Sequence, residues 1–191
     1  MGRIRYGIKN VYYATATDDG TGKLTYATPV ALPGAKKISL EAQGDSTDEY
    51  ADNTKWYHED ANNGYSGDLE FEDTAAADDF LVTVLGMTKD TTGGGILEKS
   101  TDKPVEFALA FQFELSGSEE SGKRTWLYRC TASRPKVEGD TKENGISVAT
   151  NTVTITVLPR INDDAVKYSC DSRGQNYSSW FAEVVEVGAA G

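Results

Sequence analysis

Apolar and polar residues alternate along most of this chain, which is the pattern of strands with one buried face. The clearest run has apolar residues at every second position, Val105, Phe107, Leu109, Phe111, Phe113 and Leu115. The residues between them are Glu106, Ala108, Ala110, Gln112 and Glu114. This second face is small and polar rather than fully charged, so we expect another surface to approach it closely.

Shorter alternating runs predict seven further strands, at residues 6–15, 23–31, 35–42, 125–133, 152–158, 166–170 and 180–187. The run 125–133 places Trp126, Tyr128 and Cys130 on one side. In Asp68-Leu69-Glu70-Phe71-Glu72, carboxylates and apolar side chains occupy opposite faces of another strand. Before it, Asn63-Gly64 is a hairpin-turn dipeptide, because both residues tolerate a positive φ.

Residues 74–85 have a helical rather than an alternating pattern. Their apolar side chains fall at three- and four-residue spacing, at Ala77, Phe80, Leu81, Val84 and Leu85. Asp73 or Thr74 is the expected N-cap and Gly86 the stop. The sequence therefore predicts a mainly β fold, with two packed antiparallel sheets and one flanking helix near 74–86. We expect a single domain over 1–191 with an N-terminal arm (1–20), a long protruding loop (about 44–56) and a C-terminal arm.

Negative charge is concentrated in one segment of the chain. Residues 41–73 hold eleven acids and one base, Lys55, whereas the whole chain of 191 residues has a net charge of −11. A protein this acidic does not grip nucleic acid by its phosphates. The first residues are basic, with Arg3 and Arg5.

The residue types that carry chemistry do not form a recognisable catalytic or metal motif. His58 is the single histidine, and no second His or Cys lies at ligand spacing from it. Gly117–Lys123 has phosphate-loop spacing but lies between two strand patterns, so we interpret it as a hairpin loop. Cys130 and Cys170 are expected to be buried thiols in a reducing cytoplasm. We expect no enzyme activity, no cofactor, no metal and no membrane span.

Several short motifs, each weak alone, occur together in a specific order. They are Tyr50-Ala51-Asp52-Asn53, residues 63–70, Phe80, Val84-Leu85-Gly86, residues 107–113, Ser133-Arg134-Pro135, residues 138–142, residues 152–159, Val166-Lys167 and residues 177–181. In this order and spacing the chain resembles the major tail protein, or tail tube protein, family of long non-contractile-tailed phages of Gram-positive bacteria. The resemblance spans nearly the whole chain.

The resemblance implies a structural virion protein assembled in the bacterial host cytoplasm. Its hexameric rings would stack into a tube that conducts the genome to the host. The implied partners are further copies of the chain, a tape measure protein, and tail terminator or distal tail proteins. DNA would pass through the lumen without specific binding.

Two sets of residues are candidates for lining the lumen: Asp68, Glu70 and Glu72, or Glu106, Gln112 and Glu114. Candidate subunit contacts are Arg3, Arg5, Asp45, Asp48, Glu49, Tyr50, Asp52, Asn53, Ala108 and Ala110. Two alternatives remain open. One is an immunoglobulin-like surface binding module, expected to be a monomer with an exposed aromatic patch. The other is a small β-rich hydrolase that uses paired carboxylates.

Overall fold

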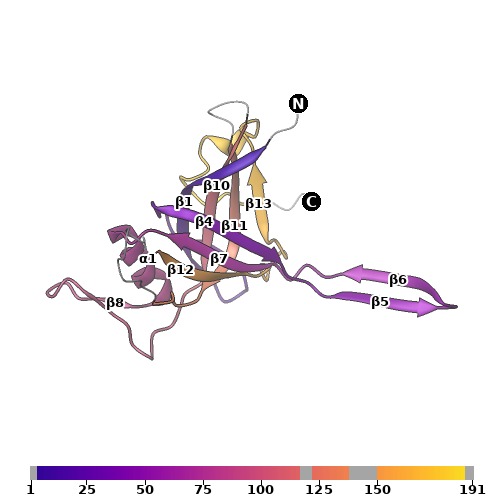
Figure 1. Ribbon diagram of the computed structural model, residues 1–191, viewed down its shortest axis with the longest axis horizontal. Helices are drawn as coiled ribbons and strands as arrows, with labels where there is room; N and C mark the ends of the chain where they lie inside the picture. Colours follow the sequence, from indigo (N-terminus) through magenta and orange to yellow (C-terminus); the bar gives the residue numbers. More distant parts are fainter. Residues whose placement is uncertain (1–3, 117–121, 138–149, 188–191) are drawn as a thin grey trace, which may run out of the picture.

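The computed structural model describes residues 4–116, 122–137 and 150–187. Over these ranges the chain is mainly β, with one nine-stranded antiparallel sheet, two two-stranded sheets and one α-helix (Figure 1). None of the described helices is long and apolar enough to span a bilayer.

The elements follow one another with short connections. The strands are β1 (Arg5–Asp18), β2 (Leu24–Tyr26), β3 (Val30–Ala31), β4 (Ala35–Ala42), β5 (Ser46–Ala51), β6 (Thr54–Asp60), β7 (Tyr65–Phe71), β8 (Thr88–Lys89), β9 (Ile96–Leu97), β10 (Phe107–Leu115), β11 (Gly122–Ala132), β12 (Asn151–Val157) and β13 (Lys167–Cys170). The helices are α1 (Ala75–Leu85) and a 3₁₀ turn, η1 (Gln175–Tyr177). The large sheet has the order β2-β1-β10-β11-β12-β7-β4, with β13 beside β11 and β3 beside β1.

This sheet curls over itself to enclose the main core. Buried residues from both halves meet there, including Val11 on β1, Leu69 on β7, Phe107 on β10 and Ile155 on β12. Strands β1 and β4, near opposite ends of the strand order, also contact each other. The predicted fold of packed antiparallel layers with one helix is confirmed, and the two layers are halves of one hydrogen-bonded sheet.

Helix α1 covers an end of this core. The Thr74 hydroxyl accepts a hydrogen bond from the backbone N–H of Ala77 (3.1 Å), and Gly86 ends the helix with a φ of 75°. The five apolar residues predicted to form its buried stripe are all buried. Phe80 lies at its centre and makes edge-to-face contacts with Tyr13, Phe71 and Phe107.

A second, smaller core lies on the other face of β10 and β11. Trp126 and Tyr128 project into it, and the C-terminal segment 175–187 covers it with Trp180 and Val185. This segment is irregular, so the predicted strand at 180–187 is wrong. Cys130 does not share the side of Trp126, because a register shift in the β10–β11 pairing turns it into the main core.

Strands β4 to β7 form one long β-ribbon. Strand β4 pairs with β7, β5 pairs with β6, and the turn between them is Asp52-Asn53 with φ of 51° and 57°. Asn63-Gly64 is therefore not the hairpin turn, since Asn63 donates to the carbonyl of Gln43 (2.9 Å) partway along the ribbon. The segment expected to be a loop at 44–56 is the distal part of this ribbon. The expected N-terminal arm is likewise part of the sheet from Arg5 onward, as strand β1.

Candidate functional site

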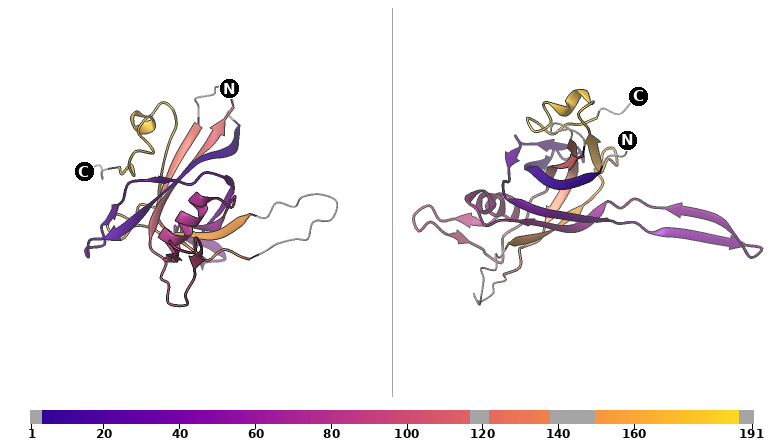
Figure 2. Two further views of the ribbon diagram at one scale, coloured as in Figure 1. Left: turned by 90° about the vertical axis from the view of Figure 1, so that its left-hand side faces the viewer. Right: turned by 45° about the horizontal axis from the view of Figure 1, so that its top comes forward.

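The distal part of the ribbon, β5 and β6, projects away from the body of the molecule (Figures 1 and 2). We call residues 46–60 the β5–β6 arm. Each of its residues is exposed, including Tyr50 (69%), Trp56 (76%) and Tyr57 (47%). A two-stranded ribbon without a covering layer is marginally stable in water. Exposed aromatic side chains gathered on such a ribbon are typical of a binding surface.

Cross-strand polar contacts hold the two strands of the arm in register. Asp48 accepts from the Lys55 ammonium (2.7 Å) and lies 2.5 Å from Nδ1 of His58. The hydrogen bond from Lys55, followed by that from His58, lowers the pKa of the Asp48 carboxyl. The other ring nitrogen of His58 lies 3.2 Å from Asp60. The single histidine therefore lies between two carboxylates of its own arm.

The arm carries most of the predicted subunit contacts. Asp48, Glu49 and Tyr50 lie on β5, and Asp52 and Asn53 form the tip. Asp45 is at the base, where its carbonyl accepts from the N–H of Ala61 (2.9 Å).

Sequence reasoning did not name Trp56 and Tyr57 among the contacts. Their signal was present, as aromatic residues inside an acidic run that has no core to fill. Arg3 lies outside the described residues, as do most of residues 117–123 with the phosphate-loop spacing. Arg5 is exposed and its guanidinium stacks on Phe113, 4.6 Å from the ring centroid.

Ala108 and Ala110 are not available as subunit contacts. Both are completely buried within the second core, against Trp126 and Trp180 of the same chain. The expectation that another surface approaches this face was right in kind, but the surface is the chain's own C-terminal segment. The C-terminal residues 175–187 therefore do not form a free arm.

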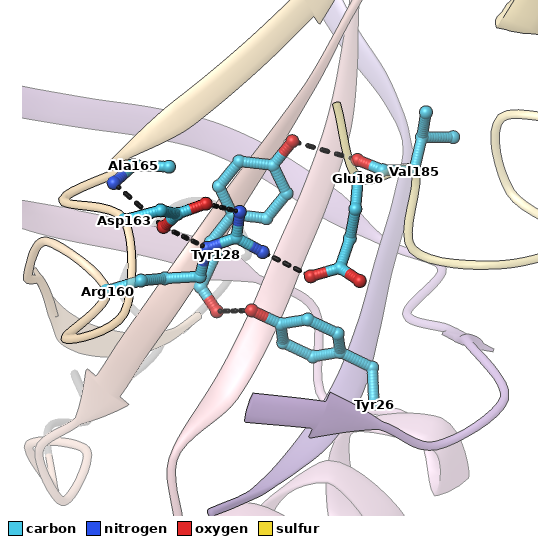
Figure 3. A network of polar contacts seen from close by, with 7 residues as sticks. All are labelled: Tyr26, Tyr128, Arg160, Asp163, Ala165, Val185 and Glu186. Atoms are coloured by element: carbon cyan, nitrogen blue, oxygen red, sulfur yellow. Dashed lines mark hydrogen bonds and ion pairs between the residues drawn. The ribbon is translucent and has the colours of Figure 1, made fainter. Parts of the chain in front are cut away.

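A polar network fastens this segment at its far end (Figure 3). Arg160, only 3% exposed, pairs with Asp163 and Glu186 and stacks on the Tyr128 ring. Tyr128 donates to the carbonyl of Val185 (2.8 Å), and Tyr26 donates to the carbonyl of Tyr128 (3.1 Å). Burial is the largest effect on the Tyr128 hydroxyl and raises its pKa to about 12.

The two candidate lumen sets differ in their surroundings. Asp68, Glu70 and Glu72 all belong to the polar side of β7 and its continuation, while Leu69 and Phe71 are fully buried on the other side. Asp68 accepts from the Thr154 hydroxyl (2.9 Å), and Glu70 pairs with Lys37 (3.3 Å). Glu72 pairs with Lys36 (2.8 Å). This face remains open and polar, with its charge partly compensated.

The second set does not form a free face. Gln112 is 4% exposed, accepts from Asn10 (3.1 Å) and from Arg124 (2.9 Å), and cannot line a lumen. Glu106 is bound by Arg129 (2.8 Å) and Glu114 by Lys9. The small residues between them lie under the C-terminal segment, which is why this strand face looked only weakly polar in the sequence.

A cleft of about 360 Å³ opens between the two halves of the sheet. Its apolar floor includes Ile38, Leu40, Phe111 and Leu127, and the cations Arg5, Lys123 and Lys167 also line it. No Asp or Glu lines this cleft. It is therefore a basic and apolar recess on a strongly acidic chain.

The described residues hold no group of three or more His, Cys, Asp or Glu side chains arranged to bind a metal ion. Cys130 and Cys170 are buried and unpaired, and burial raises the pKa of both thiols. Neither protein-family models nor curated protein sequences give a match to this chain. What the described geometry offers is an association surface: the exposed arm, the basic cleft and an open polar sheet face.

Proposed function

We propose that this chain is a structural subunit that associates with copies of itself into stacked hexameric rings, as the tube of a phage tail. The observation that carries the proposal is the β5–β6 arm. It has no core of its own and presents Tyr50, Trp56 and Tyr57 to solvent. Such a ribbon gains stability when its faces are covered by another molecule.

The resemblance in the order of short motifs supplies the specific architecture. It adds the hexameric ring, the stacking of rings, the virion location and the tape measure and terminator partners. The fold is compatible with this assembly, because a β-sandwich body with a protruding ribbon provides a compact unit and a connector. In this proposal the arm bridges neighbouring subunits or rings.

The open face of β4, β7 and β12 is the proposed lumen surface, with Asp68, Glu70 and Glu72 as its acids. Thr152, Thr154 and Thr156 of β12 lie in register with Glu70, Asp68 and Ser66 of β7. A face of hydroxyls and carboxylates offers DNA phosphates few cations to bind. Lys36 and Lys37 are each held by a carboxylate, which reduces their availability to a passing polyanion.

A surface binding module is the second candidate, because the same exposed aromatic residues would suit an unrelated partner. That function predicts a stable monomer at all concentrations. The carboxylate hydrolase has less support, because the cleft contains no acid that could serve as its catalytic pair.

Electron microscopy and light scattering of the purified full-length chain test the proposal. Rings or tubes that grow with protein concentration are the expected result. A protein that remains monomeric at high concentration, in both low and moderate salt, would refute tube formation and favour the binding module.

A further inference from the structure

The basic cleft and the acidic arm have complementary properties but cannot meet within one chain. The arm continues β4 and β7 outward, whereas Ile38, Leu40 and Tyr65 at the root of the same ribbon line the cleft. Figures 1 and 2 show the arm extending away from the body with no other described element beside it. Each copy therefore has one surface that can donate an arm and one that can receive an arm.

The charges of the two surfaces are opposite. Residues 45–60 contain six acids and one base, and that base, Lys55, is bound to Asp48. Arg5, Lys123 and Lys167 form no ion pair with any carboxylate in the described ranges. On a chain of net charge −11, three cations together without an acid mark a site for a negatively charged partner.

The apolar parts also match. Trp56 is the most exposed large side chain of the arm, because it lies where the β5–β6 register shifts between Glu49 and Tyr50. A cleft of about 360 Å³ lies at the lower end of the size range of pockets that enclose small molecules, about 300 to 1,000 Å³. One indole ring can enter such a recess. Trp is also the residue type most enriched among the energetically dominant positions of protein interfaces.

We propose that this cleft receives the β5–β6 arm of a second copy of the chain, with Trp56 as the side chain that enters it. Carboxylates of the arm then lie against Lys123, Lys167 and Arg5 at the rim. Donor and acceptor are different surfaces, so the contact is heterologous and propagates from copy to copy into a ring or a stack. This inference rests on the proposed function in taking the chain to associate with itself.

A mixing experiment with two full-length variants tests the contact. Glu49→Lys/Trp56→Ala removes the arm's anchor and one charge but keeps the cleft, and Lys123→Glu/Lys167→Glu reverses the cleft but keeps the arm. All four side chains are exposed or half-exposed in the described fold, so both variants are expected to fold. Each alone should associate at least ~10-fold more weakly than wild type, whereas their mixture should form a 1:1 dimer that does not grow. Lys99→Glu/Lys136→Glu, with the same change in charge away from the cleft, is the matched control and should assemble as wild type does.

A second measurement uses the wild-type chain. A carbodiimide joins Lys amines to carboxylates in contact, and a mixture of ¹⁴N- and ¹⁵N-labelled chains distinguishes links between copies from links within one copy. Mixed-label links from Lys123 or Lys167 to acids of residues 45–60 are the expected product. Sedimentation of the variant mixture and mass spectrometry of the links together read out the same contact independently.

The outcomes separate this inference from the proposed function. Wild-type tubes combined with a monomeric variant mixture and no arm-to-cleft links would overturn the inference alone. The same holds if the cleft variant assembles normally and loses only an affinity for DNA, since the cleft would then bind a polyanion. Arm-to-cleft links without rings or tubes would overturn the tail-tube function alone. A monomeric wild type without such links would overturn both.

Discussion

The indole N–H of Trp126 donates a hydrogen bond to the backbone carbonyl of Trp180, 3.0 Å away. This contact joins the centre of strand β11 to the C-terminal segment, 54 positions later in the chain. Both rings are fully buried, and the Tyr168 ring lies 5.2 Å from that of Trp180. The C-terminal segment thus acts as a layer of the sandwich, although it is neither a strand nor a long helix.

Replacing Trp180 tests this structural role. We expect Trp180→Ala to lower the free energy of unfolding by about 3–5 kcal/mol, the usual cost of emptying a buried aromatic site. Trp180→Phe should cost much less, because the buried indole N–H of Trp180 has no hydrogen-bond partner among the described residues and its removal relieves a desolvated donor. Urea denaturation of both variants measures the difference. Equal losses would mean that the ring does not fill a closed site.

A charged side chain at position 108 should prevent folding rather than only assembly. Ala108 has no exposed surface, so Ala108→Arg forces a long cation between tightly packed aromatic rings. Overpacking alone costs about 1–3 kcal/mol, and an unpaired buried charge adds several more. Ala51→Arg is the matched control, because Ala51 is exposed on the arm. Thermal unfolding should show a large loss for the first variant and almost none for the second; a stable Ala108→Arg monomer would contradict the second core.

The sequence predicted elements well where one local pattern decided the structure. The helix, its N-cap Thr74 and its stop at Gly86 follow from local hydrogen bonding and from the left-handed φ that glycine tolerates. The alternation at Leu69 and Phe71 correctly assigned the buried side of β7. Each of these features depends on residues within one or two turns of chain.

The failures involved contacts that are distant in the sequence. Ala108 and Ala110 looked like an interface because the pattern shows a small face but not what covers it. The covering residue Trp180 lies some seventy positions later, and its segment has no regular secondary structure to reveal it. The arm was misread as a loop because Asn63-Gly64 has a stronger turn propensity than Asp52-Asn53. Pairing across the whole ribbon, from Ala35–Ala42 outward, decided the actual turn.

Alkaline pH should weaken the fold through Tyr128. Burial raises its pKa to about 12 in the folded chain, from an ordinary value of 10.0. The stabilising contribution of the neutral hydroxyl is complete below pH 10 and is lost as the pH rises through 12. At one pKa unit per 1.36 kcal/mol, the loss is about 3 kcal/mol.

Tyr128→Phe separates this effect from other groups. The variant loses the hydrogen bond to the Val185 carbonyl, so it should be less stable at neutral pH. Its stability should then fall less steeply between pH 10 and 12. A residual slope is expected, since burial also raises the pKa of Tyr13 and Tyr26. Denaturant midpoints measured across this pH range check the prediction; parallel curves for variant and wild type would contradict it.

Removing the arm should abolish assembly and leave the body folded. Because β5 and β6 pair only with each other, the excision has to take both strands, with Ser46–Asp60 replaced by a short Gly-Ser linker. The ends are close enough to join, since Ala61 already donates to the carbonyl of Asp45 (2.9 Å). We expect an unchanged melting transition and no tubes by electron microscopy. Normal tubes would give the arm another role.

The charge of the proposed lumen can be tested by reversing it. In assembled tubes, Asp68→Lys/Glu70→Lys/Glu72→Lys should retain DNA, and the affinity should fall steeply with salt because bound phosphates release counterions. The lysines would also lose their pairing with Lys36 and Lys37, which leaves a contiguous basic face.

Asp79→Lys/Glu98→Lys/Glu183→Lys is the control for this reversal, because it makes the same change in charge on other surfaces. Asp79 and Glu98 are likewise ion-paired, with Lys89 and Arg134. Both variants should attract DNA, but a lumenal set should protect it from nuclease while an outer set should leave it accessible. Nuclease digestion of the bound DNA at low salt is the deciding measurement. If wild-type tubes themselves hold duplex DNA tightly at moderate salt, a conduit that repels its cargo is the wrong mechanism for this face.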